Sequence, residues 1–149
     1  MTKKASAVAG PDSPASCVCL NLRMSSRALS QVFDEALRPA GIKTTQFSLL
    51  RAVERMGPVG FQKLAEAMIL DQTTLPRSLR LLEKEGLIAI VPGADRRERL
   101  ASLTDAGREK LKEAAPLWKK SQERIRGKFT PERLNFLLRE LAEIRKVAA

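Results

Sequence analysis

Apolar residues recur every three or four positions through most of the chain, a spacing typical of amphipathic helices. The pattern predicts helices over residues 17–37, 44–56, 61–68, 70–86 and 104–129, and a last helix from 131 onward. Proline and glycine mark the breaks between them: Pro39 and Gly41 end the first helix, and Gly57-Pro58 ends the second. The chain is therefore expected to be mainly α-helical.

Hydroxyl side chains stand where several of these helices begin. Thr44 or Thr45 is expected to cap the second helix, and Thr104 the long fifth one. Thr130 followed by proline marks the start of the last helix. Pro116 lies inside the fifth helix and is expected to kink or divide it.

The helix over residues 70–86 has one apolar and one polar side. The apolar side consists of Leu75, Leu79 and Leu82. The polar side consists of Gln72, Thr73, Arg77 and Arg80. Asp71 is placed to accept from the amides of Thr73 and Thr74, and Gly86 to end the helix. Such a helix can enter a major groove, where Arg reads guanine and Gln reads adenine, but a surface helix with a solvated basic face fits the same pattern.

The segments on either side of this helix favour the first interpretation. The short helix 61–68 precedes it across a tight turn, which makes a helix-turn-helix. Two short strands are expected after it, over residues 87–91 and 99–103, because apolar and β-branched residues there flank a Pro-Gly turn. The loop between them carries three arginines, so strand, basic loop and strand describe a wing.

Composition limits the classes of function that remain. The 149 residues carry a net charge of +10, which favours a polyanionic partner, although an acidic membrane surface has the same sign. No apolar run approaches the ~18 residues of a membrane span. The chain has no histidine, no phosphate-cradling glycine loop and no cluster of metal ligands, which argues against an enzyme and against a cofactor or metal.

The N-terminal segment 1–16 is rich in Ala, Ser and Pro, and is expected to be a disordered tail without a signal peptide. Two cysteines, Cys17 and Cys19, follow it and fit a reducing cytoplasm. Residues i and i+2 of a helix point apart, so a bridge within one chain is unfavourable unless that end is frayed. Oxidation of a single thiol, a bridge between two subunits and simple packing stay open, and a thiolate metal site shared by two subunits is disfavoured.

The chain resembles the MarR family of bacterial winged helix-turn-helix regulators over nearly everything after residue 16. The resemblance is carried by LAEAMILDQTTLPRSLRLLEKEGLI and by ADRRERLASLTDAGREKL. Within the second stretch the family's wing signature is matched by Asp95, Arg97, Leu103, Thr104 and Gly107.

The resemblance implies a cytoplasmic homodimer that binds double-stranded DNA at a pseudo-palindromic site and is often a repressor. Its winged domain would span residues 44–103, and its dimerisation helices residues 17–43 and 104–149. The residues that would meet DNA are Gln72, Thr73, Thr74, Arg77 and Arg80 on the helix and Asp95, Arg96, Arg97 and Arg99 on the wing. Arg97 would approach the minor groove, steadied by Asp95.

Two positions depart from the family pattern. Ile69 occupies the turn where a residue tolerant of positive φ is usual, so the turn is expected to differ or to be strained. Pro76 lies about five residues into the helix, where it would delete one backbone hydrogen bond and tilt the first turn.

The resemblance also implies release from DNA by a small ligand or by cysteine oxidation. Trp118 either lines the ligand pocket or packs on the dimerisation helices. Two other classes of protein remain from the sequence: an architectural DNA binder without sequence preference, and a protein-interaction module built on the long terminal helices.

Overall fold

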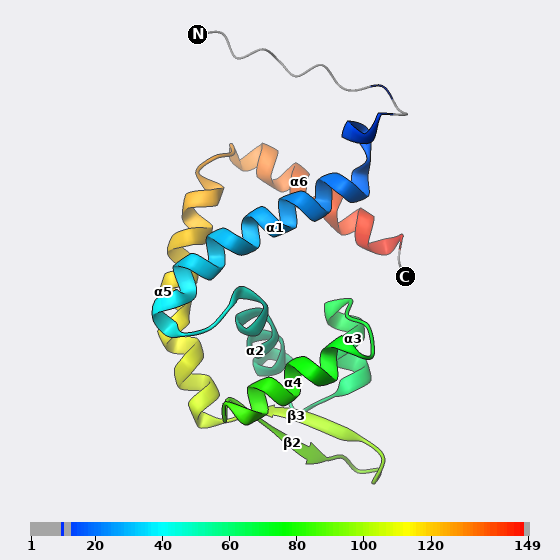
Figure 1. Ribbon diagram of the computed structural model, residues 1–149, viewed down its shortest axis with the longest axis vertical. Coiled ribbons are helices and arrows are strands. Elements are labelled where there is room, and N and C mark those ends of the chain that lie inside the picture. Colours follow the sequence, from blue (N-terminus) through cyan, green and yellow to red (C-terminus); the bar gives the residue numbers. More distant parts are fainter. Residues whose placement is uncertain (1–9, 11–12, 148–149) are drawn as a thin grey trace.

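A computed structural model describes residue 10 and residues 13–147 (Figure 1). The helices are α1 (Val18–Leu37), α2 (Thr44–Met56), α3 (Phe61–Met68), α4 (Thr74–Lys84), α5 (Asp105–Arg126) and α6 (Pro131–Lys146). The strands are β1 (Val59–Gly60), β2 (Ile88–Pro92) and β3 (Arg99–Leu103), and two short 3-10 helices are η1 (Pro14–Ser16) and η2 (Arg38–Ala40). The prediction of a mainly helical fold with a small β-wing is confirmed.

Most boundaries follow the sequence pattern, and the exceptions have local causes. Thr44 and Thr45 do not cap α2, because Lys43 is the N-cap residue. The backbone amide of Lys43 donates to Gln46 Oε1 at 2.9 Å, and that of Thr44 donates to Asp34 Oδ1 of α1 at 2.6 Å. The expectation considered only hydroxyl caps, whereas the side chains of Gln46 and Asp34 accept from the free amides at the start of this helix.

Pro116 does not divide the fifth helix, since α5 runs without interruption from Asp105 to Arg126. At the start of α5 the Thr104 hydroxyl accepts from the Gly107 amide at 3.0 Å, as expected of a cap. At the start of α6 the Thr130 hydroxyl accepts from the Arg133 amide at 3.4 Å. Of the expected N-terminal tail, residues 1–9, 11 and 12 lie outside the described residues.

The sheet has one strand more than the sequence pattern indicated. Its order is β1-β3-β2, and both pairs are antiparallel. Val59 of β1 pairs with Ala101 of β3, and β2 pairs with β3 from Ile88–Leu103 to Pro92–Arg99. The two residues of β1 are too few to produce an alternating pattern, so only their pairing partner reveals them as a strand.

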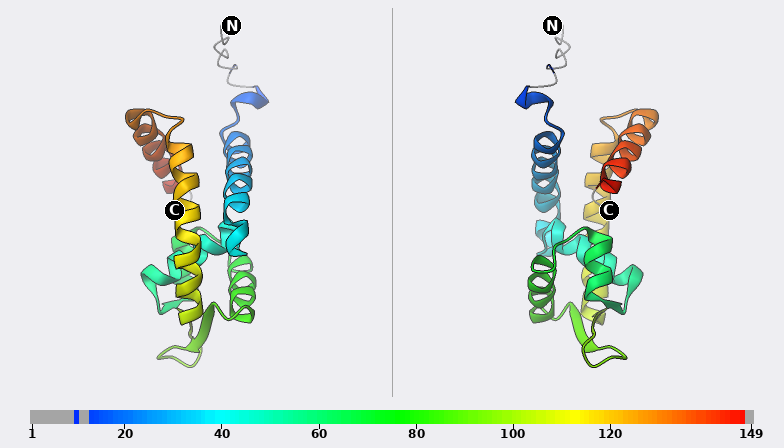
Figure 2. Two further views of the ribbon diagram at one scale, coloured as in Figure 1. Left: turned by 90° about the vertical axis from the view of Figure 1, so that its left-hand side faces the viewer. Right: turned by 90° about the vertical axis from the view of Figure 1, so that its right-hand side faces the viewer.

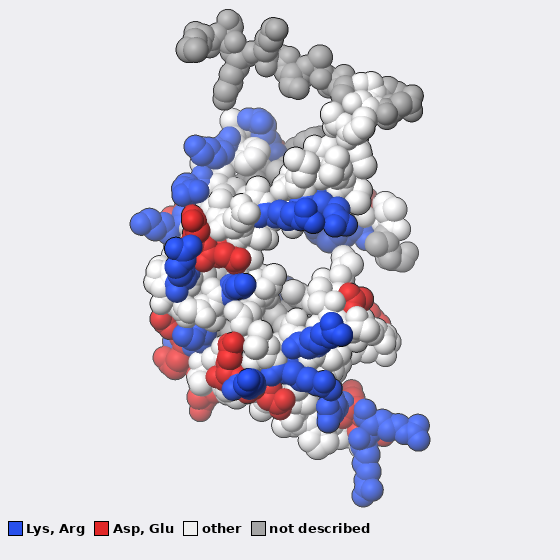
Figure 3. All heavy atoms as spheres, in the orientation of Figure 1, with Lys and Arg blue, Asp and Glu red and all other residues white. Residues whose placement is uncertain are grey.

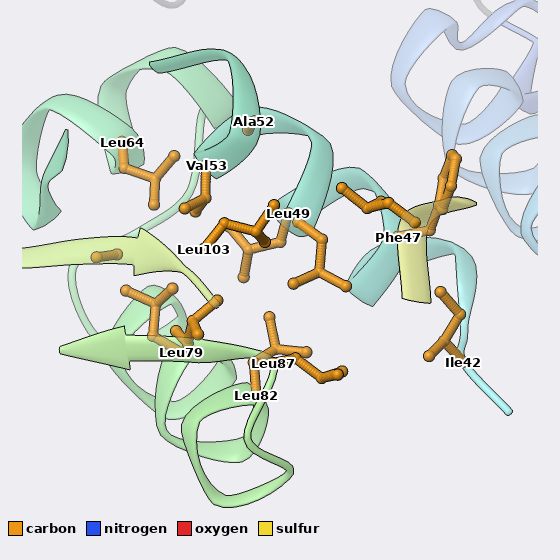
Figure 4. Packing of buried hydrophobic residues seen from close by; sticks show 14 of the residues in the cluster. Ile42, Phe47, Leu49, Ala52, Val53, Leu64, Leu79, Leu82, Leu87 and Leu103 are labelled. Carbon is orange, nitrogen blue, oxygen red and sulfur yellow. The ribbon is translucent and has the colours of Figure 1, made fainter. Parts of the chain in front are cut away.

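One hydrophobic core joins α2, α3, α4 and the sheet (Figure 4). Leu50, Leu64, Leu79 and Leu82 are each fully buried in it. Leu37 at the end of α1, and Leu111 in the first half of α5, extend the core toward the long helices. The winged unit is thereby fixed to the near ends of α1 and α5.

The long helices lead away from this core (Figure 2). The helices α1 and α5 lie side by side, and α6 turns back at the far end of α5. No residue of α6 is buried, although it carries five apolar residues at helical spacing: Leu134, Leu137, Leu138, Leu141 and Ile144. Among the described residues, no helix is long and apolar enough to span a membrane.

Candidate DNA-binding surface

The helix α4 separates its apolar and polar sides as the sequence predicts. Leu75, Leu79 and Leu82 are at most 1% exposed and anchor the helix on the core. The opposite side is exposed and presents Gln72, Thr73, Thr74, Arg77 and Arg80. Neither arginine forms an ion pair with a described residue, so both guanidinium groups are available to a ligand.

The turn between α3 and α4 contains a residue in an unfavourable backbone conformation. Ile69 has φ 51° and ψ 48°, the left-handed region that a β-branched residue rarely adopts. The turn is closed by the Leu70 amide, which donates to the Ala65 carbonyl at 2.9 Å. The expected strain at Ile69 is therefore present, and the turn keeps the geometry that usually selects glycine or asparagine.

Asp71 holds the first turn of α4 with one carboxylate. Its Oδ1 accepts from the backbone amides of Thr73 (2.9 Å) and Thr74 (2.6 Å), as predicted. The same oxygen accepts from the Thr73 hydroxyl at 2.6 Å, and Asp71 Oδ2 accepts from the Thr74 hydroxyl at 2.7 Å. These four bonds stabilise the ionised form and hold the pKa of Asp71 well below its ordinary value, the threonine hydroxyls being the largest cause.

The same bonds limit what the two threonines can offer to DNA. Each hydroxyl proton is directed at Asp71, which leaves only the oxygen lone pairs of Thr73 and Thr74 facing solvent. Donation to a phosphate would require the Asp71 bond to break. The hydrogen-bond donors that remain free on this face are therefore the side chains of Gln72, Arg77 and Arg80.

Pro76 lies closer to the start of the helix than the sequence suggested. Because α4 begins at Thr74, Pro76 is its third residue and not its fifth. The first four amides of a helix lack partners within it, so a missing N–H costs little at this position.

The end of α4 is tied to the start of α5. Gly86 has φ +74°, and the Leu87 amide donates to the Leu82 carbonyl at 2.9 Å, which closes the helix as predicted. The Thr104 hydroxyl donates to the Gly86 carbonyl at 2.7 Å. A Cβ at Gly107 would lie 2.1 Å from the Leu87 carbonyl oxygen, so this position requires glycine. The Leu-Thr-x-x-Gly signature thus fixes α4 relative to α5.

The wing loop is shaped by Asp95. Its Oδ1 accepts from the Arg97 backbone amide at 3.1 Å, and its carbonyl accepts from the Glu98 amide at 2.9 Å. Asp95 therefore positions the Arg97 backbone, while the Arg97 guanidinium forms no ion pair with a described residue. Arg96, Arg97 and Arg99 are all exposed, and Figure 3 shows Lys and Arg side chains gathered along the wing.

The fold adds residues to this surface that the sequence pattern did not single out. Lys63 and Gln62 of α3 line a groove with Arg97 and Arg99 of the wing. More than thirty residues separate the two segments, and only the pairing of β1 with β3 brings them together. No signal in the sequence could have assigned Lys63 to the basic surface.

The cysteines lie far from this surface, at the start of α1 (Figure 1). Both are exposed free thiols, and Cys17 Sγ accepts from the Leu20 amide at 3.5 Å as the helix cap. Within residue 10 and residues 13–147, no group of three or more Cys, Asp and Glu side chains is arranged to hold a metal ion.

Comparison with known proteins agrees with the geometry. The model of the MarR family matches residues 42–98. An uncharacterized HTH-type transcriptional regulator of Bacillus cereus is 32% identical over 101 residues, which are 68% of this chain and 67% of the relative. The chain belongs to the MarR family.

Solved structures of the family share the fold of this MarR-family protein. The Mycobacterium tuberculosis regulator MosR in complex with DNA superposes with a TM-score of 0.79 at 32% identity, over 89% of this chain and 98% of MosR. CouR from Rhodococcus jostii, bound to p-coumaroyl-CoA, superposes with a TM-score of 0.75 at 21% identity, over 89% and 94%. The prediction of a DNA-binding transcriptional regulator, and not an enzyme, is confirmed.

Proposed function

We propose that this MarR-family regulator is a homodimeric repressor that reads a pseudo-palindromic duplex with α4 and the wing. The observation that carries the proposal is the exposed polar side of α4, with two unpaired arginines, beside a wing with three exposed arginines. Arg77, Arg80 and Gln72 would enter the major groove, and Arg97 the minor groove. Arg96 and Arg99 would face phosphates, with Asp95 holding the wing loop. The free oxygen lone pairs of Thr73 and Thr74 would face hydrogen-bond donors in the major groove.

The dimer is supported by apolar surface that one chain leaves exposed. On α1 the exposed large apolar residues are Val18, Leu20, Met24 and Leu29, and on α6 they are Phe136, Leu137, Leu138 and Ile144. Phe136 is 57% and Leu138 is 53% exposed, which is unfavourable in water unless a second subunit covers them. We therefore assign residues 17–43 and 104–149 to dimerisation and residues 44–103 to DNA reading.

A two-fold dimer places two copies of α4 about one helical turn of DNA apart, ~10 bp centre to centre. A regulator that reads chromosomal DNA works in the cytoplasm, so the cytoplasmic location expected from the sequence is part of this proposal.

The effector site that the geometry supports best is a cleft beside Trp118. The cleft is lined by Phe47, Met68 and Trp118. Its charged lining residues are Arg55, Lys119 and the ion pair of Arg51 with Glu54 (3.0 Å). Aromatic walls and several cations suit an aromatic anion of small size. CouR was solved with p-coumaroyl-CoA, an aromatic acyl thioester with anionic phosphates. Trp118 also stacks on Phe33 of α1 and Phe47 of α2, at 6.4 Å and 5.9 Å between ring centroids.

Because Trp118 contacts α1 and α2 together, a ligand in this cleft would shift the winged unit relative to the long helices. In this proposal Trp118 both lines the cleft and packs on α1 and α2, so the two interpretations from the sequence are compatible.

Cysteine oxidation is the second route of release. Cys17 and Cys19 are exposed at the N-terminal end of α1, among the apolar residues that we assign to the dimer. A bridge between subunits, or a sulfenic acid on one thiol, would alter the packing of α1 there.

The test is fluorescence anisotropy with DNA from upstream of the protein's own gene, against a scrambled duplex, at two salt concentrations. Tight, selective binding is expected, with a stoichiometry of two chains per duplex. Because the dimer carries two copies of Arg97, Arg97→Ala should lower the slope of log K against log salt by about two. Equal binding to both duplexes would contradict the repressor and favour the architectural protein. Peroxide and aromatic acids, added in separate titrations, distinguish the two routes of release.

A further inference from the structure

Much of the positive charge lies outside the winged unit. Residues 44–103 contain nine Lys and Arg against seven Asp and Glu, whereas residues 104–149 contain twelve against seven. The reading unit therefore accounts for only a small part of the net charge of +10. Binding of one duplex by α4 and the wing does not explain this distribution.

The excess is concentrated where α5 ends and α6 begins. We call this surface the distal basic patch, and its members are Lys120, Arg124, Arg126, Lys128 and Arg133. All five residues are exposed in the single chain, and none forms an ion pair with a described residue. The dimer contact proposed above rests on the apolar residues of α1 and α6 and not on these cations. Figure 3 shows Lys and Arg side chains around this turn as well as along the wing.

The first half of α5 is built differently. There Arg108 pairs with Asp105 (3.3 Å), Lys110 with Glu113 (3.1 Å) and Lys112 with Glu109 (2.7 Å). The cations of α5 near the winged unit are therefore ion-paired, whereas Lys120 and Arg124 at its far end are not, although Glu123 lies between them in the sequence. A face that served only for solubility would not require this change within a single helix.

The helix dipole explains only part of the patch. Arg124 and Arg126 lie in the last turn of α5, where the dipole favours cations. Arg133 is in the first turn of α6, where the dipole disfavours them, and its guanidinium lies 5.4 Å from the centre of the Phe129 ring. Repulsion among these groups would be relieved by a bound polyanion.

The patch is too far from the wing to contact the same stretch of DNA. At 1.5 Å per residue the 22 residues of α5 are about 33 Å long, and the wing strand β3 precedes the first of them. Exposed charges farther apart than the Debye length, about 10 Å at 0.1 M salt, scarcely influence each other. The patch therefore adds little to the affinity for the duplex read by α4.

We propose that the distal basic patch binds the phosphates of a second duplex segment, so that one molecule bridges two segments of DNA. A duplex suits the patch because unpaired lysines and arginines bind phosphates without base contacts, and release counterions as they do so. A membrane surface suits it less, since the apolar residues of this half of α5, Leu117, Trp118 and Ile125, are half-buried and not exposed. The inference requires DNA binding by the winged unit but no particular operator.

The test is a capture assay with the full chain and two random-sequence 40-bp duplexes at 50 mM salt. One duplex is immobilised, the protein is added, and the retention of a second, fluorescent duplex is measured. The variant K120Q/R124Q should reduce this retention about tenfold. Its dissociation constant for a single duplex, measured by anisotropy, should stay within twofold of the wild-type value. The matched control R108Q/K112Q removes the same charge at the same spacing on the same helix, and should retain the second duplex.

Three results would overturn the proposal. In the first, the wild type binds the immobilised duplex and captures no second one. In the second, both variants lose capture equally, which would indicate an effect of net charge alone. In the third, K120Q/R124Q captures normally, which would indicate that two winged units hold the two duplexes. A changed sedimentation mass of K120Q/R124Q, or its loss of binding to phosphatidylglycerol vesicles while capture persists, would assign the patch to a subunit contact or to a membrane. Both duplexes have random sequences, so this assay still tests the second DNA contact if the protein shows no selectivity for an operator.

Discussion

The Thr104 hydroxyl donates a 2.7 Å hydrogen bond to the Gly86 carbonyl, across eighteen residues of the chain. The same oxygen accepts from the Gly107 amide at 3.0 Å. One side chain therefore joins the end of α4, the helix that we propose reads DNA, to the start of α5, which we assign to dimerisation.

Replacement of Thr104 by Val should test this contact. Val keeps the shape of the side chain but removes both hydrogen bonds, and should lower the free energy of unfolding by about 1–2 kcal/mol. Urea denaturation measures the change. Thr104→Ser retains both bonds and serves as the control, so an equal loss in the two variants would contradict a hydrogen-bonding role.

Gly107→Ala should destabilise the protein by about 3 kcal/mol, because the added Cβ would lie 2.1 Å from the Leu87 carbonyl oxygen. Gly127→Ala is the matched control. At Gly127 the nearest atom is 3.4 Å away and φ is −64°, so alanine fits there. Thermal unfolding measures the melting temperature of both variants. Similar values would show that α5 shifts to accommodate the methyl group at Gly107.

Ile69→Asn should raise the free energy of unfolding by about 1 kcal/mol, because asparagine tolerates the left-handed conformation that isoleucine resists. Little burial is lost, since Ile69 is 57% exposed. Ile69→Val keeps the branched Cβ and should leave the stability unchanged. A destabilised Ile69→Asn variant in urea would mean that the apolar contacts of Ile69 outweigh the backbone strain.

Protonation of Asp71 in acid should weaken its hydrogen bonds to the first turn of α4. Because the pKa of Asp71 is lowered in the folded state, its contribution to stability is complete above the ordinary aspartate pKa of 3.8. That contribution is lost as the pH falls below this value toward the lower folded pKa. The protection factors of the Thr73 and Thr74 amides, measured by hydrogen exchange, should therefore persist at pH 4 and fall only in stronger acid. Asp71→Asn, which caps helices without titrating, should show no such pH dependence.

Arg77→Ala should weaken binding to the selected duplex by about 1–3 kcal/mol if the guanidinium contacts a guanine edge. Anisotropy titrations with the selected and the random duplex measure the effect. Arg108→Ala, which removes an exposed arginine on α5, is the control and should bind normally. An equal loss on both duplexes would reassign Arg77 to a phosphate contact.

Local patterns were sufficient to predict most of the elements. The leucines of α4 are buried and its arginines exposed as the spacing required, and Gly86, Thr104 and Thr130 end or begin helices as expected. Asp71 makes the expected bonds to the first amides of α4, but the N-cap residue is Thr73 and the helix begins at Thr74, later than predicted. The strained turn at Ile69 could also be anticipated, because the preference of a β-branched residue is a property of its own backbone. The assignment of individual residues to DNA stays a prediction.

Other features depended on residues that are distant in sequence. The strand β1 exists because Val59 meets Ala101, and Lys63 joins the wing groove by the same pairing. Asp34 of α1 replaces the expected threonine cap of α2. The engagement of the Thr73 and Thr74 hydroxyls by Asp71 required the side-chain geometry of the helix start.

By itself, the sequence determined where helices form, which sides of them are apolar and that the chain belongs with winged DNA-binding proteins. Those properties follow from periodicity and local backbone preference, which act within a few residues. Only the tertiary structure decided which cations lie together, at the wing and at the far end of α5, and which apolar faces stay uncovered. Such groupings depend on the packing of elements that are tens of residues apart in the sequence, and a pattern of a few residues does not show which elements will pack together.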